Sequence, residues 1–168
     1  MSVTTSIEYH FENLQKGWAI VGRSSRGICA LFLGANQETL LEELKAAFPE
    51  THLKEALEFE PVLDPIHLVP AGDFPLDLQG TDFQKSVWIA LQKIPAGQTR
   101  TYGEIANSLG RPGAARAVGQ ACGANQIAAI IPCHRAVSAG GNSGGFRWGL
   151  QWKQGLQDAE ALSSRRSA

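Results

Sequence analysis

Cysteine is scarce in this chain of 168 residues, and its distribution excludes several kinds of protein. The three cysteines, Cys29, Cys122 and Cys133, lie far apart, and none belongs to a CxxC or CxxxH motif. A disulfide framework or a zinc site is therefore not expected, because both need a set of suitably spaced cysteine or histidine residues. A free reactive thiol is compatible with this pattern and suits a reducing cytoplasm.

Long apolar runs are also missing. No run approaches the roughly 20 apolar residues of a membrane-spanning helix, and the first residues lack the basic region and apolar core of a signal peptide. Apolar residues still make up 43% of the chain, which favours a globular protein. We expect a cytoplasmic protein of one or two small domains that does not enter a membrane.

The two halves of the chain differ in charge. Residues 1–79 hold 5 Lys and Arg against 12 Asp and Glu, a net charge of −7, and residues 80–168 hold 10 against 4, a net charge of +6. This split favours two domains, of which only the second meets a polyanion. Two differently solvated surfaces without such a partner are the alternative interpretation.

Residues 1–79 are predicted to form a small α/β domain. Short segments rich in β-branched or aromatic residues predict an antiparallel sheet over 6–11, 18–22 and 28–33. Apolar spacing predicts a helix over 38–48, and a second helix is expected over 52–59. The proline-rich stretch 61–74 is typical of a linker, and 75–78 is expected to add one strand.

Residues 80–168 are predicted to form an all-α domain, which makes the chain α+β as a whole. Capping boxes open its first two helices, at Thr81 with Gln84 and at Thr101 with Glu104. The second of these helices ends at Gly110, and a third is expected over 114–122. Two short helices joined by a tight glycine-proline turn have the spacing of a helix-turn-helix.

The third of these helices is thin, because most of its side chains are small. Arg116 is its one long charged side chain. We favour its entry into a DNA groove, since the same half of the chain also carries Arg111, Arg135 and Arg147. Close packing of the thin helix against the protein core is the alternative.

The stretch from Gln126 to Arg135 carries the strongest chemical signal. An apolar, strand-like run ends at Pro132, which has no N–H with which to continue a pairing. Cys133 is therefore expected at a fixed turn, beside His134 and an arginine. These basic neighbours are predicted to hold the thiol partly as thiolate, which is the nucleophilic form. A buried, unreactive cysteine is the alternative.

Several pieces of the second half occur together, in order, in one known family. They are Thr101–Ala106, Ala115–Gly119, Asn125, Ile130–Val137, Gly145–Gly149, Lys153 and Glu160. With this ordered set the chain resembles the O6-alkylguanine-DNA alkyltransferases, also called methylated-DNA–protein-cysteine methyltransferases, and the similarity extends weakly through the first half. The resemblance implies an RNase H-like first domain that supports a winged-helix-like second domain, which would act as a monomer on double-stranded DNA.

The resemblance implies a single-turnover DNA repair reaction. Cys133 would take the alkyl group from O6 of guanine, with O4-alkylthymine as a second candidate substrate, after the base has flipped out of the duplex. His134 would relay the thiol proton through a water, Glu160 would orient and charge-stabilise that histidine, and Tyr102 would donate a hydrogen bond to the base. No cofactor is implied, because the cysteine is the stoichiometric acceptor.

The resemblance also implies which residues contact the substrate. The DNA-binding set is Gln84, Tyr102, Arg111, Arg116, Asn125, Arg135 and Ser138. Arg116 would fill the vacated stack, Asn125 would join the hinge between recognition helix and active-site segment, and Ser138 would bind the flipped base. A structural salt bridge is the alternative role of Arg135. The substrate pocket would be lined by Phe146, Trp148 and Gly149.

Two residues depart from the pattern of the family. Phe146 stands where many relatives have tyrosine, and Ala136 replaces a commoner valine, so slower transfer or an altered preference for alkyl size is predicted. Three alternative functions follow from the same residues: a lesion-binding protein without transfer, a thiol hydrolase or redox protein, and a transcriptional regulator. The regulator is discounted, because its zinc-binding first domain needs several cysteines and the first half holds only Cys29. Cys29 and Cys122 are expected only to pack.

Overall fold

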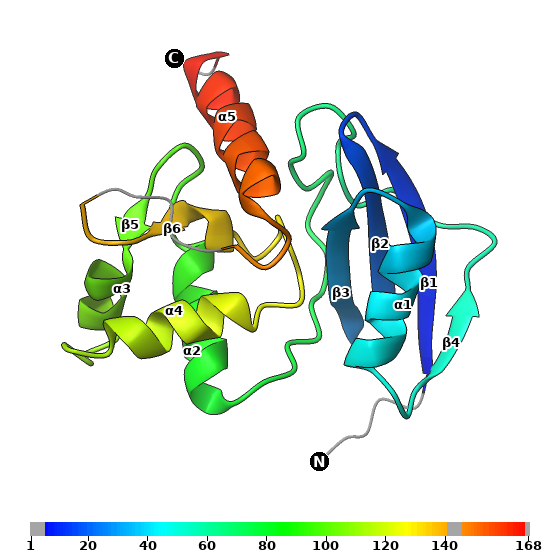
Figure 1. Cartoon of the computed structure of the whole chain (residues 1–168), viewed down its shortest axis with the longest axis horizontal. Helices are drawn as coiled ribbons and strands as arrows, with labels where there is room; N and C mark the ends of the chain where they lie inside the picture. The colour runs from blue at the N-terminus through cyan, green and yellow to red at the C-terminus, as the bar shows by residue number, and fades with distance from the viewer. Residues whose placement is uncertain (1–5, 141–145, 167–168) are drawn as a thin grey trace. The chain divides into compact units, whose positions relative to one another are not determined.

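The computed structural model describes residues 6–140 and 146–166, with side chains up to residue 162. The chain divides into two compact units, Met1–Leu78 and Gln79–Ala168. Strands with one helix make up the first unit, and helices dominate the second (Figure 1). The α+β class predicted from the sequence is confirmed. Two parts of the sequence analysis lie outside the described residues. They are Gly145 of the motif Gly145–Gly149 and residues 1–5, where no signal peptide was expected.

A four-stranded sheet forms the body of the first unit. β1 (Ser6–Leu14), β2 (Gly17–Ser24) and β3 (Gly27–Gly34) are antiparallel neighbours, as the sequence predicted. β4 (His52–Glu55) pairs in parallel with β1, which gives the order β3-β2-β1-β4. α1 (Gln37–Ala47) packs on β2 and β3 and buries the apolar residues whose spacing predicted it.

β4 shows that the helix expected over 52–59 is wrong. Its four residues pair with the first four residues of β1, from Ser6 with His52 to Tyr9 with Glu55. Ala56 continues the pairing, since its N–H donates to the Tyr9 carbonyl. The outer edge of β1 offers unpaired N–H and C=O groups, and a short extended segment satisfies them better than a single helical turn would.

The stretch 61–78, which includes the expected linker, belongs to the first unit and is fixed to the sheet of that unit. Glu12, buried on β1, accepts N–H groups of Val62 and Leu63 and a 2.6 Å hydrogen bond from His10. The strand expected over 75–78 is reduced to one isolated bridge, between Leu76 and Ile28 of β3. The sequence therefore predicts the irregular backbone here, but not the buried carboxylate that anchors it.

The second unit is built around a helix-turn-helix. Its first helix, α2 (Asp82–Gln92), starts at the capping box predicted from the sequence, in which Thr81 and Gln84 bond reciprocally. α3 (Tyr102–Ser108) and α4 (Ala115–Gly123) follow within two residues of their predicted limits, and Gly110 between them has a φ of 69°. α4 packs its buried face on α2 and α3.

Two expectations for this unit are corrected. It is not all-α, because β5 (Arg100–Thr101) and β6 (Ala136–Val137) form a short parallel pair. The apolar run 126–131 is not a strand but a series of tight turns, with Ala129 at a φ of 67°. Its apolar side chains are buried all the same, except for the half-buried Ile130, and periodicity does not distinguish a buried strand from a buried irregular segment.

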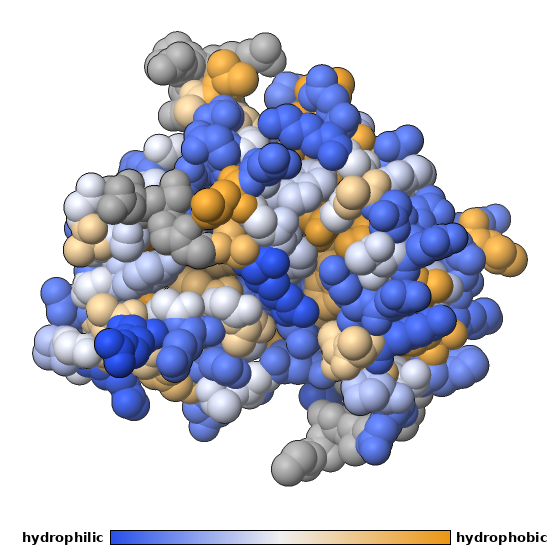
Figure 2. Space-filling view, viewed as in Figure 1, coloured by the Kyte–Doolittle hydropathy of each residue, from blue (hydrophilic) through white to orange (hydrophobic). Residues whose placement is uncertain are grey.

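The visible surface in Figure 2 is mainly hydrophilic, with apolar side chains in small scattered groups. The exposed large apolar residues are Leu57, Phe59, Ile66, Ile89, Leu150 and Leu162. No helix within the described part of the chain is both long and apolar enough to cross a membrane.

Candidate active site

Cys133 begins a single 3₁₀ turn, η1 (Cys133–Arg135), between the apolar turns and β6. Pro132 precedes it, as the sequence suggested, and the cysteine N–H donates to the Ile131 carbonyl. The cysteine is 3% exposed, so its sulfur sits in the protein and not on its surface. Successive residues of a 3₁₀ turn point about 120° apart, so neighbours in sequence face different surroundings here.

Asn125 ties the loop before η1 to the thiol. It is completely buried, and its Nδ2 donates to the carbonyls of Ile127 and Ile131 and to Cys133 Sγ at 3.3 Å. Its Oδ1 accepts the Ile127 N–H. One side chain therefore holds the turns in shape and also places a donor on the sulfur, where a negative charge would strengthen the bond.

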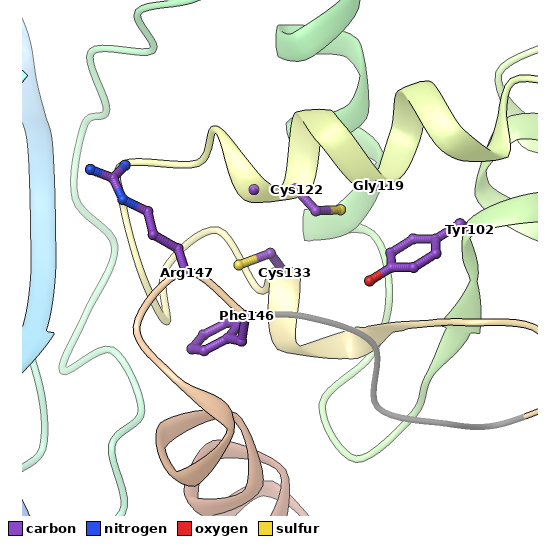
Figure 3. Close-up of a pocket in the computed structure, with 7 residues that line it drawn as sticks. Tyr102, Gly119, Cys122, Cys133, Phe146 and Arg147 are labelled. Atoms are coloured by element: carbon purple, nitrogen blue, oxygen red, sulfur yellow. The ribbon is translucent and has the colours of Figure 1, made fainter.

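A pocket of about 200 Å³ opens beside the thiol. It is lined by Tyr102, Gly119, Cys122, Gly123, Cys133, Phe146 and Arg147 (Figure 3). The Tyr102 hydroxyl points to the side of the pocket that holds Cys133, whereas the Arg147 side chain extends away from the sulfur. Gly119 lies against the tyrosine ring, and a Cβ there would be 3.9 Å from it. The pocket thus brings a nucleophile and a hydroxyl donor to one small space.

The structure corrects the prediction of a resting thiolate. Burial raises the pKa of Cys133 to about 11, although the Asn125 hydrogen bond and the charges of Lys153 and Arg147 oppose this shift. Burial likewise raises the pKa of Cys122, on the same pocket, to about 12. Both are thiols at neutral pH, and Cys133 loses its proton more readily. The basic neighbours in the sequence do not contact the sulfur in this structure, because His134 and Arg135 both face Glu160.

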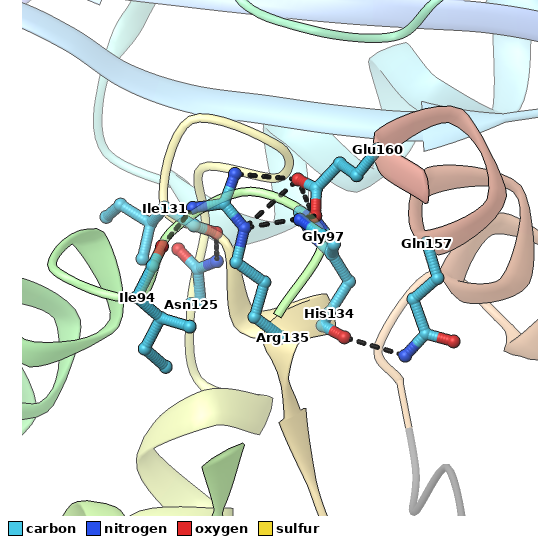
Figure 4. A network of polar contacts seen from close by, with 8 residues as sticks. All are labelled: Ile94, Gly97, Asn125, Ile131, His134, Arg135, Gln157 and Glu160. Carbon is cyan, nitrogen blue, oxygen red and sulfur yellow. Dashed lines mark hydrogen bonds and ion pairs between the residues drawn. The ribbon is translucent and has the colours of Figure 1, made fainter. Parts of the chain in front are cut away.

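His134 and Arg135 face α5 (Leu150–Arg166) and share Glu160 (Figure 4). His134 Nε2 lies 2.6 Å from Glu160 Oε1, and Arg135 Nη2 lies 2.7 Å from the same oxygen. Burial alone would raise the pKa of Glu160. The hydrogen bonds and charges of His134 and Arg135 outweigh this effect and lower the pKa to about 2. The carboxylate is therefore ionised. A neutral His134 would donate from Nε2, which leaves its buried Nδ1 as an acceptor without a hydrogen-bond partner.

Three side chains one turn apart on α5 hold the segment around Cys133. Lys153 Nζ donates to the Ala136 carbonyl at 2.9 Å, Gln157 Nε2 donates to the His134 carbonyl at 2.8 Å, and Glu160 receives the His134 ring. Positions i, i+4 and i+7 share one face of a helix. We call these three residues the α5 clamp; they bind η1 and the start of β6, whereas Asn125 binds the turns before η1 and the Cys133 sulfur.

Comparison of the sequence with known proteins identifies the family to which the residues around Cys133 belong. The DNA-binding domain of 6-O-methylguanine DNA methyltransferase matches residues 82–162. A methylated-DNA–protein-cysteine methyltransferase of Saccharomyces cerevisiae is 40% identical over 131 residues, which cover 76% of this chain and 69% of the yeast protein. The chain belongs to the 6-O-methylguanine DNA methyltransferase family. Family membership accounts for the ordered motifs around Cys133.

Two further relatives extend the match over nearly the whole chain. The Mycobacterium tuberculosis OGT, crystallised in complex with DNA, superposes with a TM-score of 0.72 at 33% identity, covering 92% of this chain and 93% of that one. The bifunctional transcriptional activator/DNA repair enzyme Ada of Escherichia coli is 39% identical over 173 residues, 96% of this chain but 47% of Ada. The chain thus spans about half the length of some curated relatives of the family.

The structure brings together part of the site predicted from the family resemblance. Cys133, Tyr102 and Phe146 line one pocket. Asn125 is not among the lining residues but contacts the Cys133 thiol. Trp148 packs edge-on against Phe146 at 5.3 Å but is not among the lining residues, and neither is Gly149, which has a φ of 99°. Among the described residues, no group of three or more His, Cys, Asp or Glu side chains could hold a metal ion.

The residues predicted to bind DNA occupy varied surroundings. Arg116 is exposed on α4, and Arg111 is exposed over the Phe83 ring. The Gln84 side chain caps α2, and Ser138 is half-buried after β6. The ion pair of Arg135 with Glu160 matches the alternative of a structural salt bridge. Contact of these five residues with DNA stays a prediction.

The sequence analysis missed several residues of the site. Cys122 was expected only to pack, yet it lines the pocket together with Gly123. Lys153 was matched to the family without a role, and Gln157 was not noticed. The spacing of Lys153, Gln157 and Glu160 at i, i+4 and i+7 is a signal that could have placed them on one helix face.

Proposed function

We propose that this protein repairs alkylated DNA by transferring the alkyl group from O6 of guanine to its own Cys133, once per molecule. The observation that carries the proposal is the position of the Cys133 sulfur, which lines a pocket of about 200 Å³ beside Tyr102 and α4. The names of the yeast and mycobacterial relatives and the DNA complex of the latter support it.

The proposed reaction is an in-line displacement at saturated carbon. The sulfur–carbon bond forms, the bond between that carbon and guanine O6 breaks, and its electron pair stays with the base. The thiol proton leaves Cys133 before attack, and a proton returns to the base, so the sum of the steps moves one proton from sulfur to guanine. The product thioether has no group that could release it, so the protein is consumed.

His134 is the proposed acceptor for the thiol proton. Its Nε2 lies 2.6 Å from Glu160, so in the neutral tautomer that donates from Nε2 the other ring nitrogen, Nδ1, is the one that can accept a proton. Nδ1 is buried and has no hydrogen-bond partner, as expected of a group that a water would join to the sulfur. Tyr102 is the proposed donor to the base as negative charge develops on it, since burial raises its pKa and keeps its proton in place.

DNA would meet the protein on the exposed side of the helix-turn-helix. α4 buries Val118 and Cys122 and leaves Arg116 exposed, so one helix can pack on the core and still present a cation to a groove. We propose that Arg116 fills the space of the flipped guanine, whose extrusion costs a few kcal/mol. The first unit is proposed to support the second, and the protein to act as a monomer on duplex DNA in the reducing cytoplasm.

Intact mass after mixing with a duplex that holds one O6-methylguanine tests the proposal. We expect a gain of one methylene on every active molecule, mapped by peptide analysis to Cys133 and not to Cys122. Cys133→Ser should show no gain. Cys29→Ser, which removes a buried thiol from the other unit, is the matched control and should gain the methylene.

Two other outcomes would replace the proposal. Unchanged mass with tight, lesion-selective binding would make the protein a lesion sensor. Unchanged mass without selective binding, together with repeated turnover of a thioester or another acyl substrate, would favour a thiol hydrolase.

A further inference from the structure

Lys153 is a buried cation in a unit that has few charged groups inside it. Its side chain is 1% exposed, which is rare for lysine because an ammonium group loses most of its hydration when buried. Its Nζ donates to the Ala136 carbonyl at 2.9 Å, three residues after Cys133. The α5 clamp therefore sets the position of this charge relative to the nucleophile, and not only the position of the backbone.

The charge of Lys153 acts on the two thiols of the pocket. Burial lowers the pKa of Lys153, while negative charge on Cys133 or Cys122 would raise it. In return, Lys153 lowers the pKa of both cysteines against the effect of burial. A cation and an acid that favour each other's charged forms stabilise an ion pair, and low local polarity makes that coupling strong.

The other titratable or charged groups near Cys133 are less suited to this task. They are Tyr102 on α3, Cys122 on α4 and Arg147 ahead of α5, besides the adjacent His134, whose ring faces Glu160. The first two carry no positive charge in any state. Arg147 is exposed, its Nη1 donates to the Asn125 carbonyl, and its side chain extends away from the sulfur (Figure 3). Water screens a charge in that position far more than one inside the protein.

We propose that Lys153 is a positioning residue for the alkyl transfer: its buried ammonium group, anchored on the Ala136 carbonyl, is the counter-charge of the Cys133 thiolate. This inference rests on the proposed function. Lys153 keeps its proton throughout; the thiol proton leaves, sulfur attacks the alkyl carbon, and the positive charge loses its partner when the neutral thioether forms.

The rate of Cys133 alkylation by iodoacetamide, measured without DNA across a range of pH, tests the pairing directly. In that reaction the sulfur–carbon bond forms and iodide leaves, so the rate follows the thiolate fraction. Peptide mass mapping separates Cys133 from Cys122. For Lys153→Met we expect the rate profile to move up by about one pH unit or more, or about tenfold slower labelling at a fixed pH below the transition. Lys153→Arg keeps the charge and should stay within about half a unit of the wild type.

Lys93→Met is the matched control, because Lys93 is an exposed lysine of the same unit, at the C-cap of α2. It should leave the profile unchanged. A Lys153→Met protein that melts cooperatively and keeps the wild-type profile would overturn the inference, since a purely structural lysine affects folding but not the pH at which the thiol reacts.

A reciprocal measurement covers the case in which Lys153→Met does not fold. NMR of protein carrying ¹³C at lysine Cε follows the titration of Lys153, whose signal is the one missing from the Lys153→Arg spectrum. Blocking Cys133 with iodoacetamide should lower the pKa of Lys153 by about half a unit or more and leave that of Lys93 unchanged. An identical Lys153 titration before and after blocking would refute the pairing. Neither measurement uses DNA, so a protein that fails to repair lesions can still confirm or refute this inference.

Discussion

Replacing Glu160 by glutamine should remove most of the electrostatic stabilisation of the active-site segment. The carboxylate is buried and receives His134, Arg135 and the Gly97 N–H. Its pKa falls from an ordinary 4.5 to about 2, and a difference of about 2.5 units corresponds to roughly 3 kcal/mol at neutral pH. Removing one partner of a buried ion pair costs about 3–5 kcal/mol, which agrees with this value. We therefore expect Glu160→Gln to lower the free energy of unfolding by about 3 kcal/mol.

The pH dependence of this loss follows from the direction of the shift. A carboxyl group whose pKa is lowered in the folded state stabilises the protein above its unfolded pKa and stops doing so as the pH falls toward its folded pKa. The wild type should therefore lose this stabilisation between about pH 4.5 and about pH 2. Glu160→Gln has no carboxyl group to protonate, so the difference between the two proteins should shrink across the same window.

Urea unfolding followed by tryptophan fluorescence measures the effect in the second unit. Trp18 is the single tryptophan of residues 1–78, so a Trp18→Phe background confines the signal to the unit that holds Glu160. Asp158→Asn, an exposed change two residues away on α5, is the control and should cost less than about 0.5 kcal/mol. Equal stability of Glu160→Gln and wild type at pH 7, or a difference that persists unchanged at acid pH, would refute the reasoning.

Three further substitutions test other contacts. Gly27→Ala should release residues 75–78 from β3, because Gly27 has a φ of 144° and a Cβ would lie 2.3 Å from the Pro75 carbonyl oxygen; faster limited proteolysis within residues 61–78 would show it, and wild-type resistance would contradict it. Trp88→Phe removes the 2.8 Å bond from Nε1 to the Ala121 carbonyl and should lower the unfolding free energy by about 1–3 kcal/mol in urea. An unchanged value would mean that the carbonyl finds another donor. Asn125→Ala removes the donor to the active thiol and should raise the pKa of that thiol by about one unit, read from iodoacetamide rates; an unshifted profile in a folded variant would be inconsistent with that role.

Local patterns in the sequence predicted the elements whose causes are local. The segments rich in β-branched or aromatic residues that form β1 to β3 and the capping box at Thr81 each depend on residues a few positions apart, and the structure has both. β4 was missed because its partner is the edge of β1, more than forty residues away. Sequence spacing carries no information about such an edge, so a four-residue segment was assigned to a helix.

Cys133 was singled out for a reason that is only partly physical. Pro132 and the family motif predicted it at a fixed turn, which the structure has, but the sequence placed His134 and Arg135 beside the sulfur because they follow it in the chain. In a 3₁₀ turn they point away from it, toward Glu160. Asn125, eight residues earlier, is the side chain that reaches the thiol. The neighbours that tune a pKa are neighbours in space, and a linear motif identifies them only when the local backbone is known.

A resting thiol would suit the single use of the protein that we propose. With a pKa of about 11, Cys133 is ionised in on the order of one molecule in ten thousand at pH 7. Small electrophiles and oxidants react with the thiolate, so burial protects the acceptor until a substrate arrives. Reaction then needs about 5 kcal/mol of help in ionising the sulfur, and the bound state must supply it. Lys153 of the α5 clamp and Asn125 hold a positive charge and an amide donor near the sulfur beforehand, so a base that enters the pocket, as proposed, would meet a nucleophile whose surroundings are already arranged for charge.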